Sequence, residues 1–208
     1  MTSIRVGLLV ACVVLPACAQ ARPTSASPQA QLDWKRVVTA EDMERIKAWR
    51  SAFVKALEDA KARGDGGRIA NEGPLLDPDA AMGGAGPAPG DYRCRVIKLG
   101  TTSPAMPAYT VYPDFACTIA DEGEVMSFAK TGGSQRPVGL IFPGDDRRQI
   151  FLGTMMLGDE TRPMDYGRDS LRDMAGAVER IGPNRWRLIL PYPHFESVMD
   201  VIELVPQA

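Results

Sequence analysis

The sequence has little of the chemistry that most metal and nucleophilic sites require. It contains one histidine, His194, and four cysteines in 208 residues. Because zinc sites draw on several histidine or cysteine ligands, a multi-histidine metal site is excluded, and we expect neither a metal nor a cofactor. The 26 Asp plus Glu nearly balance the 24 Lys plus Arg, so the strongly basic profile of a nucleic-acid-binding protein is absent as well.

Long apolar runs are also missing, except at the N-terminus. Residues 6–17 form a run of about twelve residues behind Arg5, which is too short to span a bilayer and is typical of a signal peptide. The run ends in Leu-Pro-Ala-Cys, which is similar to a bacterial lipobox with Cys18 as the lipid attachment site. Ala-Cys-Ala also fits ordinary cleavage, which would release a soluble periplasmic or secreted chain. We expect a signal peptide over 1–18, and Ala19 favours outer-membrane sorting by resemblance to known lipoproteins.

The remaining cysteines predict a structural disulfide. Cys12 lies inside the predicted signal and Cys18 is lipidated or removed, so the exported chain keeps Cys94 and Cys117. A lone cysteine pair in an oxidising compartment indicates a disulfide. The spacing is unlike the Cys-x-x-Cys pattern that redox-active pairs use.

A tether and one globular domain are expected after the signal. Residues 19–32 are rich in Ala, Pro, Ser and Gln, which predicts an unstructured tether. Residues 33–206 are sufficient for a single core. Within them, 39–63 carry apolar residues at steps of three and four behind the N-cap Thr39, which predicts an amphipathic helix. Residues 64–90 are rich in Gly and Pro without periodicity and are expected to form a loop.

The β region, residues 91–205, has a different texture. Short apolar runs alternate with Gly, Pro and Asp, and no helical segments intervene. The pattern predicts a mainly β fold, an antiparallel β-barrel or sandwich of about eight short strands with one N-terminal amphipathic helix. The candidate strands are 92–99, 108–112, 115–120, 125–130, 138–142, 149–155, 175–181, 185–190 and 197–205.

The densest polar segment is 157–173, which holds several carboxylates and arginines. Carboxylates at this density could supply a general acid and a base, but a solvated loop with Arg–Asp pairs is the interpretation we favour. Arg93 and Arg95 share one face of a predicted strand and could bind an anion or pair with these acids. The candidate polar binding site comprises Arg93, Arg95, Asp159, Glu160, Tyr166, Arg168 and Asp169.

A serine-centred site finds little support. Ser134 lies in Gly-Gly-Ser-Gln-Arg, which resembles a nucleophile elbow until Arg136 takes the position that needs glycine. An order of Ser134, an aspartate and His194 would match α/β-hydrolases, yet that fold needs parallel strands with helical crossovers. We therefore assign no catalytic residue.

Several runs together resemble an uncharacterised family of exported bacterial proteins, domain of unknown function 4893. The resemblance covers roughly residues 34–206. It implies a location in the cell envelope and supplies no activity, substrate or catalytic residue. The runs are DYRCRVIKLG at 91–100, GSQRP at 133–137, FLGT at 151–154, LGDE at 157–160, VERIG at 178–182 and RWRL at 185–188.

From these features we expect a non-enzymatic envelope protein, tethered to the outer membrane, that binds an unknown small molecule or another envelope protein. One alternative is a carboxylate-based periplasmic hydrolase centred on Asp159, Glu160 and Asp169. Another is a β-barrel that binds an envelope protein in the manner of a protease inhibitor, which is an analogy at the level of fold alone. A purely structural protein would have a filled barrel without a cavity of ligand size.

Overall fold

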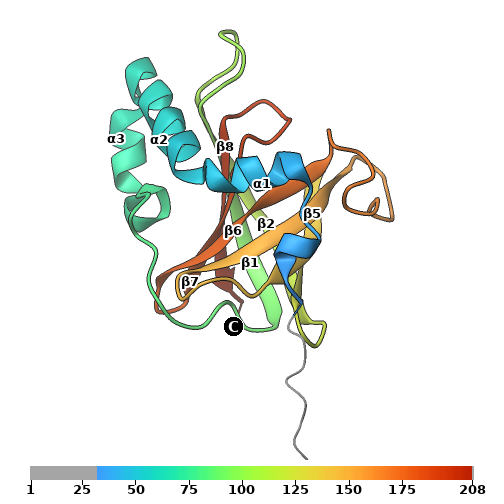
Figure 1. Ribbon diagram of the computed structural model, residues 1–208. Coiled ribbons are helices and arrows are strands. Elements are labelled where there is room, and N and C mark those ends of the chain that lie inside the picture. The colour runs from blue at the N-terminus through green and yellow to red at the C-terminus, as the bar shows by residue number, and fades with distance from the viewer. Residues whose placement is uncertain (1–31, 208) are drawn as a thin grey trace, which may run out of the picture. The chain divides into compact units, whose positions relative to one another are not determined.

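The structure is a computed structural model that describes residues 32–207. The predicted signal peptide, Cys18 and almost all of the predicted tether lie outside the described residues. The described chain forms a closed antiparallel barrel in which each strand pairs with the next and β8 pairs with β1, as expected for a mainly β protein (Figure 1). The strands are β1 Gly90–Leu99, β2 Tyr109–Asp121, β3 Met126–Lys130, β4 Gln135–Phe142, β5 Arg148–Leu157, β6 Asp173–Gly182, β7 Arg185–Pro191 and β8 Met199–Pro206.

Strand β2 joins two runs that the sequence predicts as separate strands. The two predicted strands, 108–112 and 115–120, lie on either side of Pro113, and a proline lacks the N–H for a ladder hydrogen bond. In the structure Arg95 pairs with Asp114, whereas Ile97 pairs with Val111, so the register shifts between these two pairs. A β-bulge at this point leaves a position where a proline fits, and β2 continues through it.

The helical region is more divided than the single helix expected over 39–63. Thr39 is the N-cap as predicted, and its side chain accepts a hydrogen bond from the backbone N–H of Asp42. The helix is interrupted at Ala48, and Gly64 has a left-handed φ of 99° that kinks the chain within η2, after α2 has ended at Ala60. No helix within the described residues is both long and apolar enough to cross a bilayer. The segments are η1 Trp34–Arg36, α1 Ala40–Lys47, α2 Trp49–Ala60, η2 Lys61–Asp65, α3 Gly66–Asn71 and η3 Gly73–Leu76.

The predicted loop over 64–90 is therefore wrong in its first half, where α3 and η3 lie. The glycines of the first half, Gly64, Gly66, Gly67 and Gly73, lie within helical segments, whereas Gly83, Gly84 and Gly86 lie in the irregular segment before β1. The apolar pair Leu75 and Leu76 in η3 is buried against the barrel. Burial of such side chains explains why the segment is ordered despite its composition.

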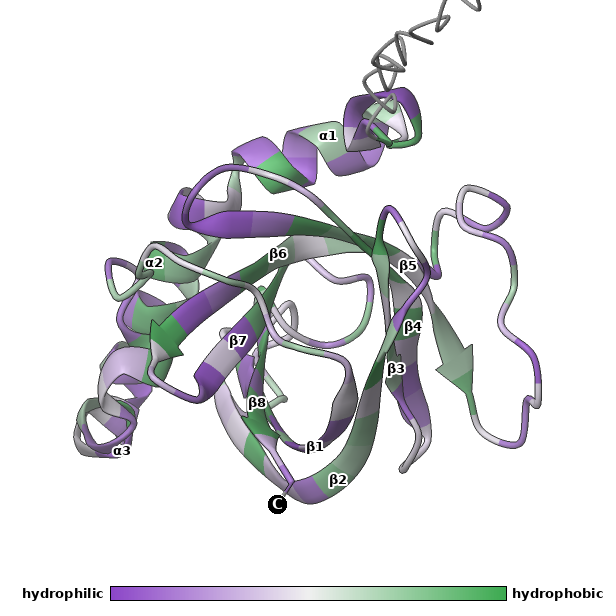
Figure 2. Cartoon of the chain, turned by 90° about the horizontal axis from the view of Figure 1, so that it is seen from below, coloured by the Kyte–Doolittle hydropathy of each residue, from purple (hydrophilic) through white to green (hydrophobic). Residues whose placement is uncertain are grey.

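The strands separate two apolar cores, one inside the barrel and one outside it. Figure 2 shows the strands curving around a common centre with the helices outside them. Along β1, Cys94 and Val96 point into the barrel, whereas Ile97 and Leu99 pack outside it against α2. This alternation is the period of two that a strand imposes. Phe53 of α2 is fully buried in the outer core.

One end of the barrel is covered by the segment that leads into β1 (Figure 1). Tyr92 donates a hydrogen bond from its hydroxyl to the carbonyl of Ala88 at 2.7 Å, and the indole N–H of Trp186 donates to the carbonyl of Ala85 at 3.2 Å. The two rings meet edge to face with centroids 6.4 Å apart. Pro87 between these contacts is buried. These side chains fill the barrel at that end.

The helices are tied to the barrel wall by a buried arginine. The guanidinium of Arg187 in β7 donates to the carbonyls of Pro74, Leu75 and Asp77 at 3.0, 2.9 and 2.7 Å. Its charge is balanced by Glu179 of β6, and neither side chain is exposed. The bonds fix η3 and the residues after it against the sheet.

Candidate functional site

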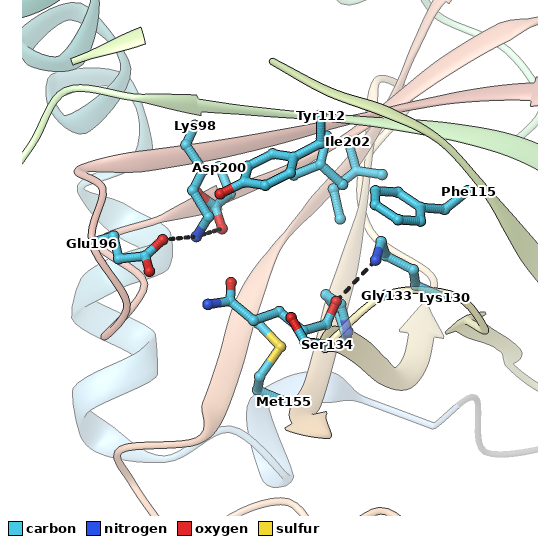
Figure 3. Close-up of a pocket in the computed structure, with 13 residues that line it drawn as sticks. Lys98, Tyr112, Phe115, Lys130, Gly133, Ser134, Met155, Glu196, Asp200 and Ile202 are labelled. Atoms are coloured by element: carbon cyan, nitrogen blue, oxygen red, sulfur yellow. Dashed lines mark hydrogen bonds and ion pairs between the residues drawn. The ribbon is translucent and has the colours of Figure 1, made fainter. Parts of the chain in front are cut away.

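The barrel interior contains a pocket at the end opposite the covered one. It opens where β1 ends and β8 begins, and has a volume of about 190 Å³. Figure 3 shows two lysines, two carboxylates and a group of apolar side chains converging on it. The lining residues are Val96, Lys98, Tyr112, Phe115, Lys130, Gly133, Ser134, Gln135, Pro137, Met155, Glu196, Asp200 and Ile202.

Lys98 is the first of the two lysines, and carboxylates balance its charge. Its Nζ lies 3.4 Å from Asp200 Oδ2 and 3.4 Å from Glu196 Oε2. Asp200 also accepts a hydrogen bond from the hydroxyl of Ser197 at 2.5 Å. Burial raises the pKa of Asp200, and the contacts with Lys98 and Ser197 oppose that rise.

Lys130, the last residue of β3, is only 4% exposed and makes no ion pair with any carboxylate among residues 32–207. Its Nζ donates to the carbonyls of Gly132 at 2.5 Å and Gln135 at 3.0 Å, and lies 3.6 Å from the centre of the Phe115 ring. Burial lowers the pKa of Lys130 to about 8, and repulsion from Arg136 and Lys98 contributes to the shift.

The rest of the pocket is an apolar floor with a polar rim. Val96, Met155 and Ile202 belong to the buried core of the barrel and form the deeper wall. Ser134 and Glu196 are exposed at the entrance. Glu196 has a left-handed φ of 70° in the connection between β7 and β8, which is uncommon for a residue with a side chain. Such a backbone at a pocket entrance is typical of functional connections.

The arginines of the sequence-predicted polar site do not reach this pocket. Arg95 points away from the barrel interior and pairs with Glu72 at 2.5 Å and Glu203 at 2.9 Å. Arg93 pairs with Asp114 across β1 and β2 at 3.2 Å. Both arginines therefore bind acids other than those in 157–173.

Segment 157–173 is held by internal pairs and by contacts with the α1 region, among them a hydrogen bond from Arg45 to the carbonyl of Asp173 at 2.8 Å. Glu160 and Asp169 both face Arg172, at 2.5 and 3.8 Å. Tyr166 donates its hydroxyl hydrogen to Asp42 of α1 at 2.5 Å. Asp159 is exposed, and the backbone N–H of Arg168 bonds the carbonyl of Asp165. The seven predicted residues thus do not form one site, and only Glu160 and Asp169 share a partner.

The sequence does contain an indication of this pocket, although the denser charges of 157–173 drew attention to a different segment. On each of three strands a charged residue lies two positions from an inward-facing apolar residue: Lys98 from Val96, Lys130 from Phe128, and Asp200 from Ile202. Buried charges are costly unless they are paired and hydrogen-bonded, so charges in the inward register of a barrel strand point to a polar cluster inside the barrel.

Neither a metal site nor a serine–histidine pair is formed in the described residues. No three His, Cys, Asp or Glu side chains of residues 32–207 are arranged to hold a metal ion. Ser134 lines the pocket, whereas His194 lies 3.6 Å from Glu41 of α1 and does not line it. The pocket chemistry of the described chain therefore consists of ammonium, carboxylate, hydroxyl, amide and apolar groups.

Comparison with known proteins places the chain in a family. It belongs to the family described as Domain of unknown function (DUF4893), which matches residues 34–204. The match includes the whole barrel except the last residues of β8. No curated protein and no solved structure was found to match the chain.

Proposed function

We propose that this DUF4893 protein is a non-enzymatic binding protein that receives a small molecule, or one end of a larger one, in the mouth of its barrel. The observation that carries the proposal is the pocket of about 190 Å³ within an otherwise filled barrel. Ligand pockets commonly have volumes of about 300–1,000 Å³, so this one suits a small ligand or a terminal group.

The pocket is rigid enough to bind without large rearrangement. Most of its lining residues stand on strands that pair with neighbours on both sides. The disulfide between Cys94 and Cys117 joins β1 to β2 next to the pocket floor at Val96. A preformed site loses less conformational entropy on binding, which favours affinity for a small ligand.

The proposed location is the cell envelope, with Cys18 as a lipid anchor in the outer membrane and a freely secreted chain as the alternative. The disulfide supports an oxidising compartment. The intact mass of the protein extracted from its own envelope should show a diacylglyceryl group on Cys18. A free chain that begins at Gln20 would contradict the anchor and leave the binding proposal standing.

Native mass spectrometry of the gently extracted protein tests binding. We expect a reproducible added mass of up to a few hundred daltons. Ser134→Trp, which places an indole at the exposed entrance, should remove that mass, whereas Ser51→Trp on the outer face of α2 should retain it. A bare chain, or an added mass that Ser134→Trp leaves in place, would contradict binding in the barrel mouth.

A further inference from the structure

Lys130 is the exception among the buried cations of the described chain. Four basic side chains are buried: Arg45, Lys98, Lys130 and Arg187. Arg45 pairs with Asp42, Lys98 with Asp200 and Glu196, and Arg187 with Glu179. Lys130 has carbonyl oxygens and an aromatic face as its neighbours.

Those neighbours solvate the ammonium group of Lys130 without neutralising its charge. Carbonyl oxygens and the face of a ring attract a cation, but neither carries a formal negative charge. Arg136 and Lys98 add repulsion, and no acid of residues 32–207 offsets it. Because buried charges in proteins are normally paired, an uncompensated ammonium at an open pocket lacks a partner that a ligand can supply.

We infer that the ligand is a small organic anion whose carboxylate or phosphate group binds Lys130 while its apolar part lies against Val96, Met155 and Ile202. This inference rests on the proposed function and names the chemical class of the ligand. An inorganic anion gains nothing from the apolar wall of the pocket. The combination of a cation and an apolar wall therefore favours an organic anion. The pocket volume supports a short apolar part, because a cavity of about 150 Å³ accommodates benzene.

The carboxylate of Glu196 lies at the pocket entrance, where it would compete with an anionic ligand. Its carboxylate lies 3.4 Å from Lys98 at the rim and is 40% exposed, so it can leave the pocket without losing a buried environment. Asp200 keeps the charge of Lys98 balanced when Glu196 moves away. Removing the charge of Glu196 should therefore strengthen the binding of an anion, since repulsion at the entrance is lost.

Calorimetric titration of the full exported chain with matched probes tests the inference. The probes are benzoate, phenyl phosphate, benzyl alcohol, benzylamine and inorganic phosphate. Benzoate or phenyl phosphate should bind roughly 10- to 100-fold more tightly than benzyl alcohol, as expected for a charge-assisted hydrogen bond. Benzylamine and inorganic phosphate should bind most weakly. The ratio between benzoate and phenyl phosphate distinguishes a carboxylate ligand from a phosphate ester.

Three variants assign the effect to the pocket. Lys130→Met should reduce the affinity for the anionic probes by roughly 10-fold or more and leave that for benzyl alcohol nearly unchanged. Lys61→Met, at an exposed helical position, is the matched control. Glu196→Gln should increase the affinity for benzoate several-fold, and a gain of affinity cannot arise from misfolding.

The outcomes separate this inference from the proposed function. Equal binding of benzoate and benzyl alcohol would overturn the anionic class while supporting a ligand pocket. So would an endogenous mass that Ser134→Trp removes when no anionic probe binds at millimolar concentration. Unchanged benzoate affinity in Lys130→Met would overturn the role of Lys130. Absence of both endogenous mass and probe binding would overturn the inference and the proposed function together.

Discussion

Glu179 and Arg187 are direct partners across β6 and β7, and neither has any exposed side-chain surface. Their charged atoms lie 2.6 Å apart on the outer wall of the barrel. A second arginine, Arg148, also contacts Glu179 and stacks 4.0 Å from the ring centre of Trp49. Arg187 thus fixes η3 to the sheet through its backbone carbonyls, and Arg148 links Glu179 to the indole of Trp49 in α2.

Breaking this pair should destabilise the fold far more than removing an exposed one. Glu179→Gln leaves the Arg187 charge buried without its partner, and we expect a loss of about 3–5 kcal/mol in the free energy of unfolding. Arg50→Met removes an exposed pair with Asp79 and should cost about 0–1 kcal/mol. Urea denaturation measures both. Equal losses in the two variants would show that the buried pair contributes only as much as a surface contact.

The disulfide should stabilise the barrel because it restricts the unfolded chain between Cys94 and Cys117. Cys94 and Cys117 are 23 residues apart, and cross-links of this length contribute roughly 3–4 kcal/mol in the chain-entropy treatment. We expect the double variant Cys94→Ala, Cys117→Ala to unfold at a lower urea concentration than the oxidised protein. Peptide mapping without reductant should join the two cysteines. Two freely alkylatable thiols in the untreated protein would contradict the bridge.

Lys130 should link stability to pH. Its pKa is lowered to about 8, so between that value and its unfolded value of about 10.5 the unfolded chain holds a proton that the folded chain has lost. Unfolding therefore becomes less favourable as pH rises through this range. The charged groups that repel Lys130 are Arg136 and Lys98, and Asp200 and Glu196 lie beside Lys98.

Lys130→Met removes that dependence. At pH 7 the variant should be more stable than the native protein by ~1 kcal/mol, because an uncompensated buried charge is replaced by an apolar side chain. The difference should shrink as the pH is raised from 8 to 10, where the native lysine is neutral. Denaturation at a series of pH values compares the two proteins. A difference that stays constant over this range would show that Lys130 is not the titrating group.

The carboxylates of 157–173 should be dispensable for ligand binding. Asp159→Asn, Glu160→Gln and Asp169→Asn act on a segment that does not line the barrel pocket. Glu160 and Asp169 pair with Arg172, so we expect a modest loss of stability, about 1 kcal/mol for the triple variant. The endogenous mass should persist. Loss of that mass, or of a cellular phenotype, without unfolding would favour the hydrolase alternative.

The sequence predicts the barrel well because its strands alternate with turn residues and lack intervening helices. It errs where tertiary contacts override a local signal. Pro113 suggests a strand break, but the bulge opposite β1 lets β2 continue through it. The glycines of 64–90 suggest a loop, but burial of Leu75 and Leu76 holds two helical segments in place. Such contacts depend on distant strands and leave no local pattern.

The site was harder to predict because proximity in a barrel depends on register. Charge density drew attention to 157–173, where the acids pair with neighbouring arginines. Lys98 and Lys130 are isolated among apolar residues in the sequence and meet only when the strands close into a barrel. The alternation of residues along each strand indicates that both lysines face inward, but it does not indicate the strand pairing that brings β1 near β3.

Because the first strand of the barrel pairs with the last, the sheet cannot close until β8 is present. Tyr92 pairs with Pro206 and Leu99 with Met199, so the ring closes only when the final strand is available. A chain truncated before residue 199 would leave both β1 and β7 with unpaired backbone, and such edges promote aggregation. Contacts between such distant segments also slow folding. Prematurely terminated products would thus expose free strand edges, whereas the closed sheet of the described residues has none.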